Sequence, residues 1–185
     1  MFKFHAERLP FVIRPAEPED ITACCQLDGS YQTDYVWQMH FQESEQTVQS
    51  SFSRVRLPRT MVVAYPYPGD DLRLILEQAA YLLVATYEDK IVGCVDGVLE
   101  VARRNFTVNN LIVQRQARRQ GIGRSLLKAV NSLAIRNDCW HVTMAVQTKN
   151  YPAIEFMGKT GFVYCGYNDK YYNNGDIALI FSLKL

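Results

Sequence analysis

The alternation of apolar and polar residues is clearest in the second half of the chain. Two apolar runs, 81–86 and 91–95, flank the polar segment Glu88-Asp89-Lys90, which is typical of two strands joined by a hairpin turn. A third apolar run ends at residue 113, and apolar side chains then recur three and four residues apart, at Ile122, Leu126, Leu127, Val130, Leu133 and Ala134. Because this spacing places them on one helical face, the pattern predicts a strand that begins near Asn109, followed by a turn and then a helix.

The rest of the chain predicts a mixture of strands and helices. Before residue 81 we expect a strand at 11–14, a helix at 19–27, an irregular aromatic segment at 31–41, a helix at 42–53, an extra strand at 59–65 and an aspartate-capped helix at 70–79. After the long helix we expect a strand at 140–146, a helix capped by Asn150 and ended by Gly161, and an antiparallel strand pair at 162–166 and 177–183. No repeat or linker is present, so the sequence predicts a single α/β domain over residues 1–185.

The turn before the long helix has the composition of an anion site. Gly121 and Gly123 open the helix, and they leave no Cβ between the backbone N–H groups and a ligand. The first N–H groups of a helix point outward at the positive end of its dipole, an arrangement that binds phosphate oxygens. Arg118, Arg119 and Arg124 add positive charge at the same point. We therefore expect a pyrophosphate site here.

These residues carry a family resemblance. The run Arg118-Arg119-Gln120-Gly121-Ile122-Gly123 resembles the Arg/Gln-x-x-Gly-x-Gly/Ala signature of the GNAT superfamily of N-acetyltransferases. Residues 150–162 resemble the Asn-x-x-Ala-x-x-Phe-Tyr-x-x-x-Gly-Phe helix of the same family. The resemblance covers about residues 81–185. It implies a mixed, mostly antiparallel central sheet with a splayed parallel strand pair, flanked by helices.

The resemblance also implies that acetyl-coenzyme A is the cosubstrate. Its pyrophosphate would lie on the glycine turn, and its pantetheine arm would pair like an added strand with the exposed edge of the preceding strand. The cofactor-binding residues implied in this way are Leu111, Ile112, Val113, Arg118, Arg119, Gln120, Gly121, Ile122, Gly123, Arg124, Asn150, Ala153 and Phe156. No metal is expected, because the three histidines and five cysteines show no metal-ligand spacing.

Two positions depart from the family pattern, and both bear on catalysis. Met157 stands where many members carry a tyrosine that protonates the leaving thiolate, and Asn109 and Asn110 stand where many relatives carry an acidic residue. Asp96 and Glu100, on one face of their strand, are alternatives for the acid. Candidates further along the chain are Tyr164, Cys165, Tyr167, Tyr171 and Tyr172. We choose Tyr172 as the proton donor because it precedes the final strand and resembles a tyrosine near the C-terminal end of streptothricin acetyltransferases.

Charge is unevenly distributed although the formal net charge is only +1. Residues 15–53 contain no Lys or Arg but seven acids, Glu17, Glu19, Asp20, Asp28, Asp34, Glu43 and Glu45. Residues 101–137 contain eight bases and no acid. The acidic, aromatic-containing stretch suggests a cationic acceptor, and a solvated acidic surface is the alternative interpretation.

Together these features predict an enzyme. Residues 161–172 and 176–179 resemble the end of streptothricin acetyltransferases, which acetylate an amine of a cationic antibiotic. We therefore expect an acetyl-CoA-dependent N-acetyltransferase that acts on a primary amine of a small, cationic molecule or a peptide. The alternative is a catalytically silent acetyl-CoA-binding sensor or regulatory module.

The sequence also narrows the partners and the location. Because the bases gather at one turn, nucleic acid is not expected as a partner, and no apolar run is long enough for a membrane span. The scattered cysteines and the lack of a signal-peptide pattern predict a cytoplasmic protein. A homodimer is compatible with the sequence.

Overall fold

The computed structural model describes residues 10–185, which pack as two compact units. Within the described residues, unit 1 comprises 10–29, 67–143 and 184–185, and unit 2 comprises 30–66 and 144–183. The expectation of a single domain over residues 1–185 stays a prediction.

The sheet confirms the predicted mixed α/β class. Its seven strands lie in the order β1-β4-β5-β6-β7-β9-β8, and all pairs are antiparallel except the parallel pair of β6 and β7. The strands of unit 1 are β1 (Val12–Pro15), β4 (Tyr81–Tyr87), β5 (Lys90–Glu100), β6 (Asn105–Val113) and the first residues of β7 (His141–Gln147). Glu88 and Asp89 adopt positive φ angles of 47° and 59°, so the predicted hairpin turn between β4 and β5 is confirmed.

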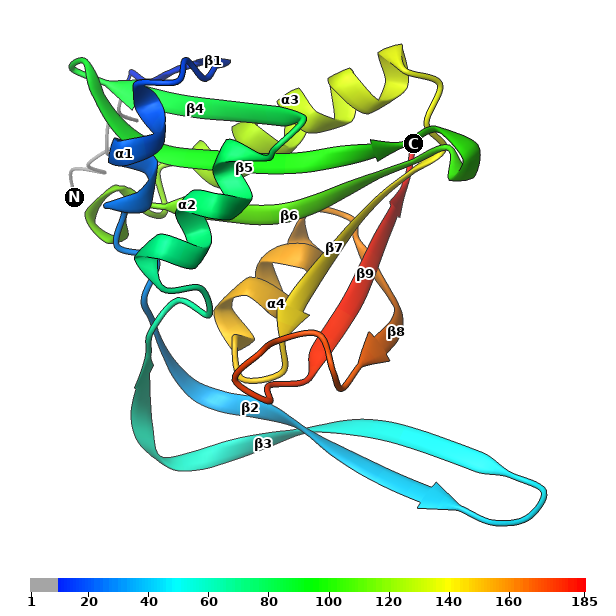
Figure 1. The fold of residues 1–185 in the computed structure, drawn as a ribbon. Helices are drawn as coiled ribbons and strands as arrows, with labels where there is room; N and C mark the ends of the chain where they lie inside the picture. The colour runs from blue at the N-terminus through cyan, green and yellow to red at the C-terminus, as the bar shows by residue number, and fades with distance from the viewer. Residues whose placement is uncertain (1–9) are drawn as a thin grey trace, which may run out of the picture. The chain divides into compact units, whose positions relative to one another are not determined.

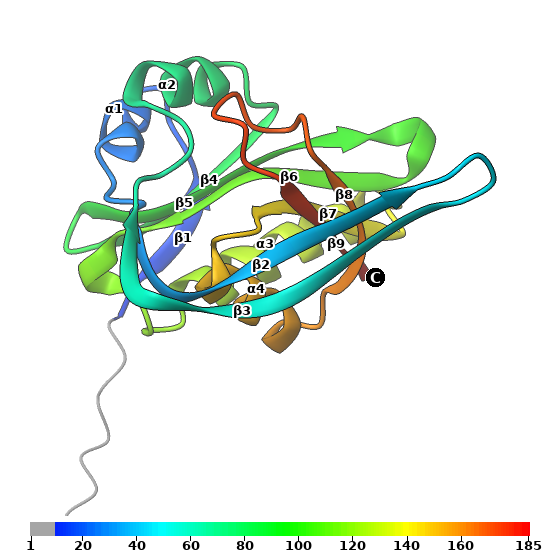
Figure 2. The ribbon, with the colours of Figure 1, turned by 90° about the horizontal axis from the view of Figure 1, so that it is seen from below.

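Helices cover both faces of the sheet in unit 1. Helices α1 (Asp20–Cys25) and α2 (Gly69–Glu77) lie over one face of β4, β5 and β6, and α3 (Ile122–Arg136) lies over the other (Figures 1 and 2). The buried residues of α3 are Ile122, Leu126, Leu127, Val130 and Ala134, which confirms the predicted apolar face. Short 3-10 helices, η1 (Val101–Arg103) and η2 (Arg115–Ala117), flank β6. The chain thus passes from the end of β6 through η2 and the glycine turn into α3.

Unit 2 contains the second half of the sheet and a separate hairpin. Its main elements are α4 (Tyr151–Lys159), β8 (Val163–Asn168) and β9 (Ala178–Lys184). Asn150 caps α4 as predicted, because its Oδ1 accepts a hydrogen bond from the Ala153 N–H at 3.1 Å. Gly161 has a φ of +90° just beyond the helix, which confirms its role in ending it.

The hairpin of unit 2 corrects the prediction for residues 31–53. The aromatic segment is not irregular and residues 42–53 are not helical, because β2 (Tyr31–Glu43) and β3 (Val48–Val63) form a long antiparallel pair (Figure 1). Along most of β2, more buried positions alternate with exposed ones, and this period of two is that of a strand. The extra strand predicted at 59–65 is the end of β3. The predicted aspartate cap of α2 is also wrong, because Pro68 occupies the N-cap position and makes no side-chain cap hydrogen bond.

Two absences concern the described residues, 10–185. No helix in this range is both long and apolar enough to cross a membrane. The same residues contain no group of three or more His, Cys, Asp or Glu side chains arranged to hold a metal ion.

Candidate functional site

The glycine turn of unit 1 presents backbone N–H groups at the start of α3. Gly121 precedes the helix with a φ of +92°, a left-handed conformation that favours glycine. The first helical bond runs from the Ser125 N–H to the Gly121 carbonyl at 3.0 Å. The N–H groups of Ile122 and Gly123 therefore precede the first helical bond. A Cβ on Gly121 would have no other heavy atom within 4 Å, so the space beside this turn is open to an anion.

The arginines of this turn have different surroundings. Arg118 is half-buried, and its guanidinium donates to the Val113 carbonyl at 2.9 Å and to the Asp28 carbonyl at 3.0 Å. Burial lowers the pKa of Arg118. Arg119 and Arg124 are exposed at the start of α3. Arg118 thus fastens the turn to the end of β6, while Arg119 and Arg124 carry the exposed charge.

The strand before the turn contains a β-bulge. Asp96 of β5 is opposite Asn110 and Gly97 is opposite Val108, so Asn109 is one extra residue in β6. The resemblance assigns Leu111, Ile112 and Val113 of β6 to the cofactor; Leu111 and Val113 are half-buried, and Ile112 is buried. The bulge therefore interrupts regular pairing immediately before this edge.

A buried carboxyl group lies beside the bulge. Asp96 is 1% exposed, and its Oδ2 accepts a hydrogen bond from Asn109 Nδ2 at 3.1 Å. Among the described residues Oδ1 has no partner of good geometry, although Asn110 lies close enough to favour the charged form. Burial outweighs these amides and raises the pKa of Asp96 to about 6. This carboxyl group can therefore change its charge near neutral pH.

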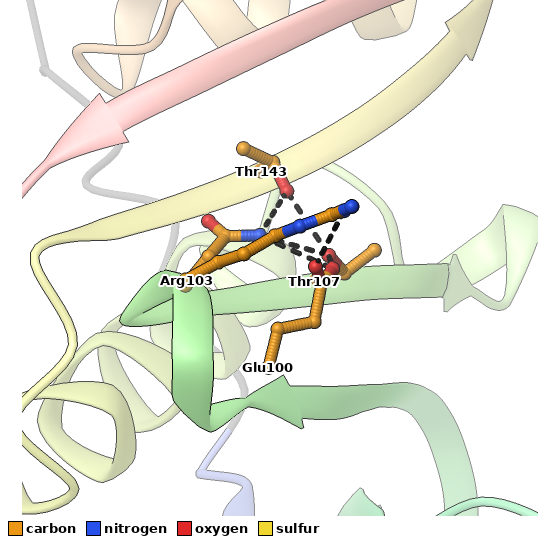
Figure 3. A network of polar contacts seen from close by, with 5 residues as sticks. Glu100, Arg103, Thr107 and Thr143 are labelled. Carbon is orange, nitrogen blue, oxygen red and sulfur yellow. Dashed lines mark hydrogen bonds and ion pairs between the residues drawn. The ribbon is translucent and has the colours of Figure 1, made fainter.

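Glu100, the other acidic candidate of β5, lies in a polar network at the end of the β5–β6 pair (Figure 3). Thr107 donates to its Oε1, and Arg103 pairs with its Oε2 at 3.0 Å. Asn105 donates to Glu100 and to the hydroxyl groups of Thr107 and Thr143. The hydrogen bond from Thr107, followed by those from Arg103 and Asn105, lowers the pKa of Glu100. Glu100 therefore joins the ends of β5, β6 and β7 and is not suited to accept a proton at neutral pH.

In unit 2, the residues expected to flank the cofactor lie on α4. Asn150 uses its side-chain oxygen to cap the helix, and Ala153 and Phe156 are half-buried. Met157 is fully buried at 0% exposure. The residue that replaces the usual tyrosine is thus part of the core and provides no proton donor.

Tyr172 lies in the loop between β8 and β9. It is 8% exposed, and its ring centroid lies 4.9 Å from that of Tyr171 in an edge-to-face arrangement. Asp176 holds the same loop, because it pairs with Lys149 at 2.7 Å and accepts from Asn174 Nδ2 at 2.8 Å. The phenol of Tyr172 is therefore placed by an ordered loop.

A chain of polar contacts that the sequence did not predict starts at Asp176. Gln147 donates to Asp176 and accepts from the Tyr31 hydroxyl at 3.1 Å. Gln147 is 2% exposed. Burial, followed by the charge of Asp176, raises the pKa of Tyr31. No local pattern in the sequence indicated these contacts, because the bond between Tyr31 and Gln147 joins residues 116 positions apart.

Unit 2 also contains an aromatic cavity of about 270 Å³. It is lined by Trp37, Ser50, Ser51, Phe52, Ile154, Tyr164, Leu179 and Phe181. Arg54 holds the hairpin against α4, because it donates to the Tyr151 hydroxyl at 2.9 Å and lies 5.1 Å from the Tyr35 ring centroid. Trp37, which could line an acceptor site or belong to the core, thus contributes to the wall of a cavity.

The acidic stretch predicted to attract a cation is divided between the two units. Asp20 of unit 1 pairs with Arg14 at 2.5 Å, and this hydrogen bond lowers its pKa. Asp34 of unit 2 accepts from the Thr60 hydroxyl at 2.6 Å. Part of this negative charge is therefore neutralised or bonded within the protein.

Comparison with known proteins identifies one matching family and several solved structures with a similar fold. The model of the acetyltransferase (GNAT) family matches residues 34–162. The streptothricin acetyltransferase of Streptomyces lavendulae is 25% identical over 187 residues, which is 94% of each chain. The structure of a nourseothricin acetyltransferase has a TM-score of 0.80 at 24% identity, covering 94% of this chain and 98% of the other. A candidate streptothricin acetyltransferase from Bacillus anthracis, in complex with acetyl coenzyme A, has a TM-score of 0.72 at 16% identity, covering 97% and 99%.

Proposed function

Because this chain belongs to the acetyltransferase (GNAT) family and is an N-acetyltransferase, we propose that it acetylates a primary amine of a small, cationic molecule or of a peptide. Acetyl-CoA is the cosubstrate, and the open glycine turn at the start of α3 is the observation that carries the proposal. The turn fits a pyrophosphate, because glycine at position 121 leaves the space beside the N–H groups open.

The turn would hold the pyrophosphate through the N–H groups of Ile122 and Gly123. Arg119 and Arg124 add charge that is accessible to a ligand, and a charge-assisted hydrogen bond to phosphate is about twice as strong as a neutral one. Arg118 acts differently, since its bonds to the Val113 and Asp28 carbonyls set the shape of the turn.

When it is bound, acetyl-CoA supplies an activated thioester. The chain must then position the amine, stabilise charge on the thioester oxygen and provide a proton for the leaving sulfur. A backbone N–H near Val113 is our candidate for the oxyanion donor. Tyr172 is our candidate for the proton donor, since a phenol is protonated at neutral pH and Met157 cannot donate.

The acceptor is proposed from the relatives and from the chemistry of the chain. Two similar proteins are a streptothricin acetyltransferase and a nourseothricin acetyltransferase. The tail of this chain resembles the same subgroup, and we propose a cationic amine of comparable chemistry as its acceptor. Oligomeric state is left as a prediction, with a homodimer compatible with the sequence.

A turnover assay over a panel of amines tests the proposal. Acetyl-CoA would be incubated with streptothricin, with small polyamines, with peptides and with acidic amines, and released thiol would be measured. We expect thiol release with cationic primary amines and little with acidic ones. Binding of coenzyme A without turnover on any amine would instead support a silent sensor module, for which the buried Met157 is the specific observation.

A further inference from the structure

We infer that Asp96 is a positioning residue for acetyl transfer, whose buried carboxylate fixes the amide of Asn109 so that its oxygen accepts a hydrogen bond from the acceptor amine. This inference rests on the proposed function. It assigns a role to a buried carboxyl group and to a bulge that the binding of the cofactor alone does not require.

The direction of β6 places these residues near the reacting end of the cofactor. The pyrophosphate turn follows the C-terminal end of β6, so a pantetheine arm paired along this strand runs back from Val113 past Leu111. The arm spans roughly the length of four residues of extended strand. Its thioester end therefore reaches the level of the bulge at Asn109.

The hydrogen bond between the two side chains sets the orientation of the amide. Asn109 Nδ2 donates to Asp96 Oδ2 at 3.1 Å, and an ionised carboxylate can only accept. The amide nitrogen is therefore held toward Asp96, and the amide oxygen is directed away from it. Asn109 is half-buried while Asp96 is 1% exposed, so Asn109 is the member of the pair that a substrate can contact.

Protonation of Asp96 would reverse this arrangement. A neutral carboxyl group can donate a hydrogen bond to the Asn109 oxygen, which turns the NH₂ group toward the acceptor. An NH₂ group cannot accept a hydrogen bond from an amine. We therefore expect the carboxylate to support transfer above the pKa of Asp96, about 6, and the support to disappear as the pH falls through that value.

The other titratable and charged groups near this face of the sheet lie on β5, α1 and α2. Asp96 lies on the same side of β5 as Cys94, whose thiol contacts Cys24 of α1. Burial and its neighbours raise the pKa of Cys94, and burial raises that of Cys25. On α2 the buried side chains are Leu72 and Leu76. The charged side chains of the two helices are Asp20, paired with Arg14, and Asp70, Asp71, Arg73 and Glu77, of which Arg73 pairs with Glu77.

The test compares the parent with Asp96→Asn and Asn109→Ala in the full-length protein. Glu100→Gln, a carboxylate on the same strand in the network of Figure 3, is the matched control. For each protein kcat and KM would be measured from pH 5 to pH 8 with one amine that the parent acetylates. The ratio of kcat/KM between parent and variant cancels the titration of the acceptor amine, which is common to both.

We expect Asp96→Asn and Asn109→Ala to lower kcat at pH 7.5 by about 10- to 100-fold, the size of a lost hydrogen bond to a charged group. The KM for acetyl-CoA should stay nearly unchanged. The ratio of kcat/KM between the parent and Asp96→Asn should fall toward one below pH 6. The double variant Asp96→Asn/Asn109→Ala should lose no more activity than the more impaired single variant. Glu100→Gln should retain the pH profile of the parent. A ratio that does not change with pH, or Asn109→Ala with full activity, would overturn the inference.

A spectroscopic measurement separates this inference from the proposed function. In the parent, the side-chain ¹⁵NH₂ resonances of Asn109 should shift with the midpoint of Asp96, and this shift should be missing in Asp96→Asn. If these resonances do not respond to pH, the positioning pair is wrong even in an active enzyme. If the parent acetylates no amine, the proposed function fails first, and the role of Asp96 in transfer fails with it.

Discussion

Two carboxylates of β5, Asp96 and Glu100, lie four residues apart on the same strand and have opposite electrostatic surroundings. Glu100 receives hydrogen bonds from Thr107, Arg103 and Asn105, which lower its pKa. Asp96 is buried beside two amides, and burial raises its pKa to about 6. The difference shows that the balance between burial and hydrogen bonding, rather than position on the strand, decides which acid has a structural role and which can take part in proton-linked chemistry.

The largest effect should come from the proton donor, which neither carboxylate provides. General acid catalysis contributes about 10²–10⁴-fold, so Tyr172→Phe should lower kcat by that factor while the dissociation constant of acetyl-CoA stays unchanged. Steady-state kinetics and calorimetry would measure the two quantities. If Tyr172→Phe turns over like the parent, Tyr172 is structural, and protonation of the thiolate by solvent becomes the better explanation.

Stability at different pH values tests the comparison on the Asp96 side. Because the pKa of Asp96 in the fold is raised to about 6, from about 3.9 in an unfolded chain, its ionisation destabilises the fold as the pH rises through this range, by about 3 kcal/mol. Asp96→Asn should therefore gain about 3 kcal/mol relative to the parent between pH 4 and pH 7.5. Urea unfolding at both pH values measures this, and an unchanged difference would show that Asp96 is not a raised-pKa acid.

Two arginines of the glycine turn differ in a similar way, because Arg118 is hydrogen-bonded within the fold and Arg119 is exposed. Arg118→Ala removes bonds to two carbonyl groups, and we expect a loss of about 2 kcal/mol of folding free energy. The exposed Arg119→Ala should unfold like the parent but bind coenzyme A several-fold more weakly, with a smaller dependence on salt. Equal loss of stability in both variants would contradict the different roles.

The smallest effect should come from Glu100. Because its pKa is lowered, its contribution to stability is present above its unfolded pKa and is lost as the pH falls through the folded value. Glu100→Gln should therefore destabilise the fold by about 1 kcal/mol at pH 7 and by less at pH 3.5, the opposite trend to Asp96→Asn. Thermal unfolding at the two pH values provides the measurement, and a parallel trend in the two variants would contradict the comparison.

The sequence was most informative where structure depends on neighbouring residues. The strand, glycine turn and helix from residue 109 onward were predictable, because a buried strand, two glycines and a 3.6-residue apolar period are all local signals. The cap at Asn150 was predictable for the same reason. These elements also define the candidate pyrophosphate site, so the resemblance and the local pattern indicated the same residues.

The errors occurred where pairing or burial depends on distant residues. Residues 42–53 gave no strong local signal, and outside the turn at 44–47 they are strand because the ends of β2 and β3 pair there. The burial of Asp96 depends on the helices over its face of the sheet, and α1 is distant from it in the sequence. Likewise, Arg118 belongs to the glycine motif, but its bond to Asp28 links residues 90 positions apart. No local pattern could show that this arginine is bonded within the fold.

The most direct test of the central claim is calorimetric titration of coenzyme A into the parent and Gly121→Val. Since Gly121 has a φ of +92°, valine also strains the backbone, and Gly175→Val, at another open glycine with a φ of +78°, is the matched control. We predict that the parent and Gly175→Val bind coenzyme A alike, while Gly121→Val, folded as judged by circular dichroism, binds at least about 100-fold more weakly, a difference of about 2.7 kcal/mol. Binding of coenzyme A by Gly121→Val as tight as that of the parent would contradict the assignment of the glycine turn.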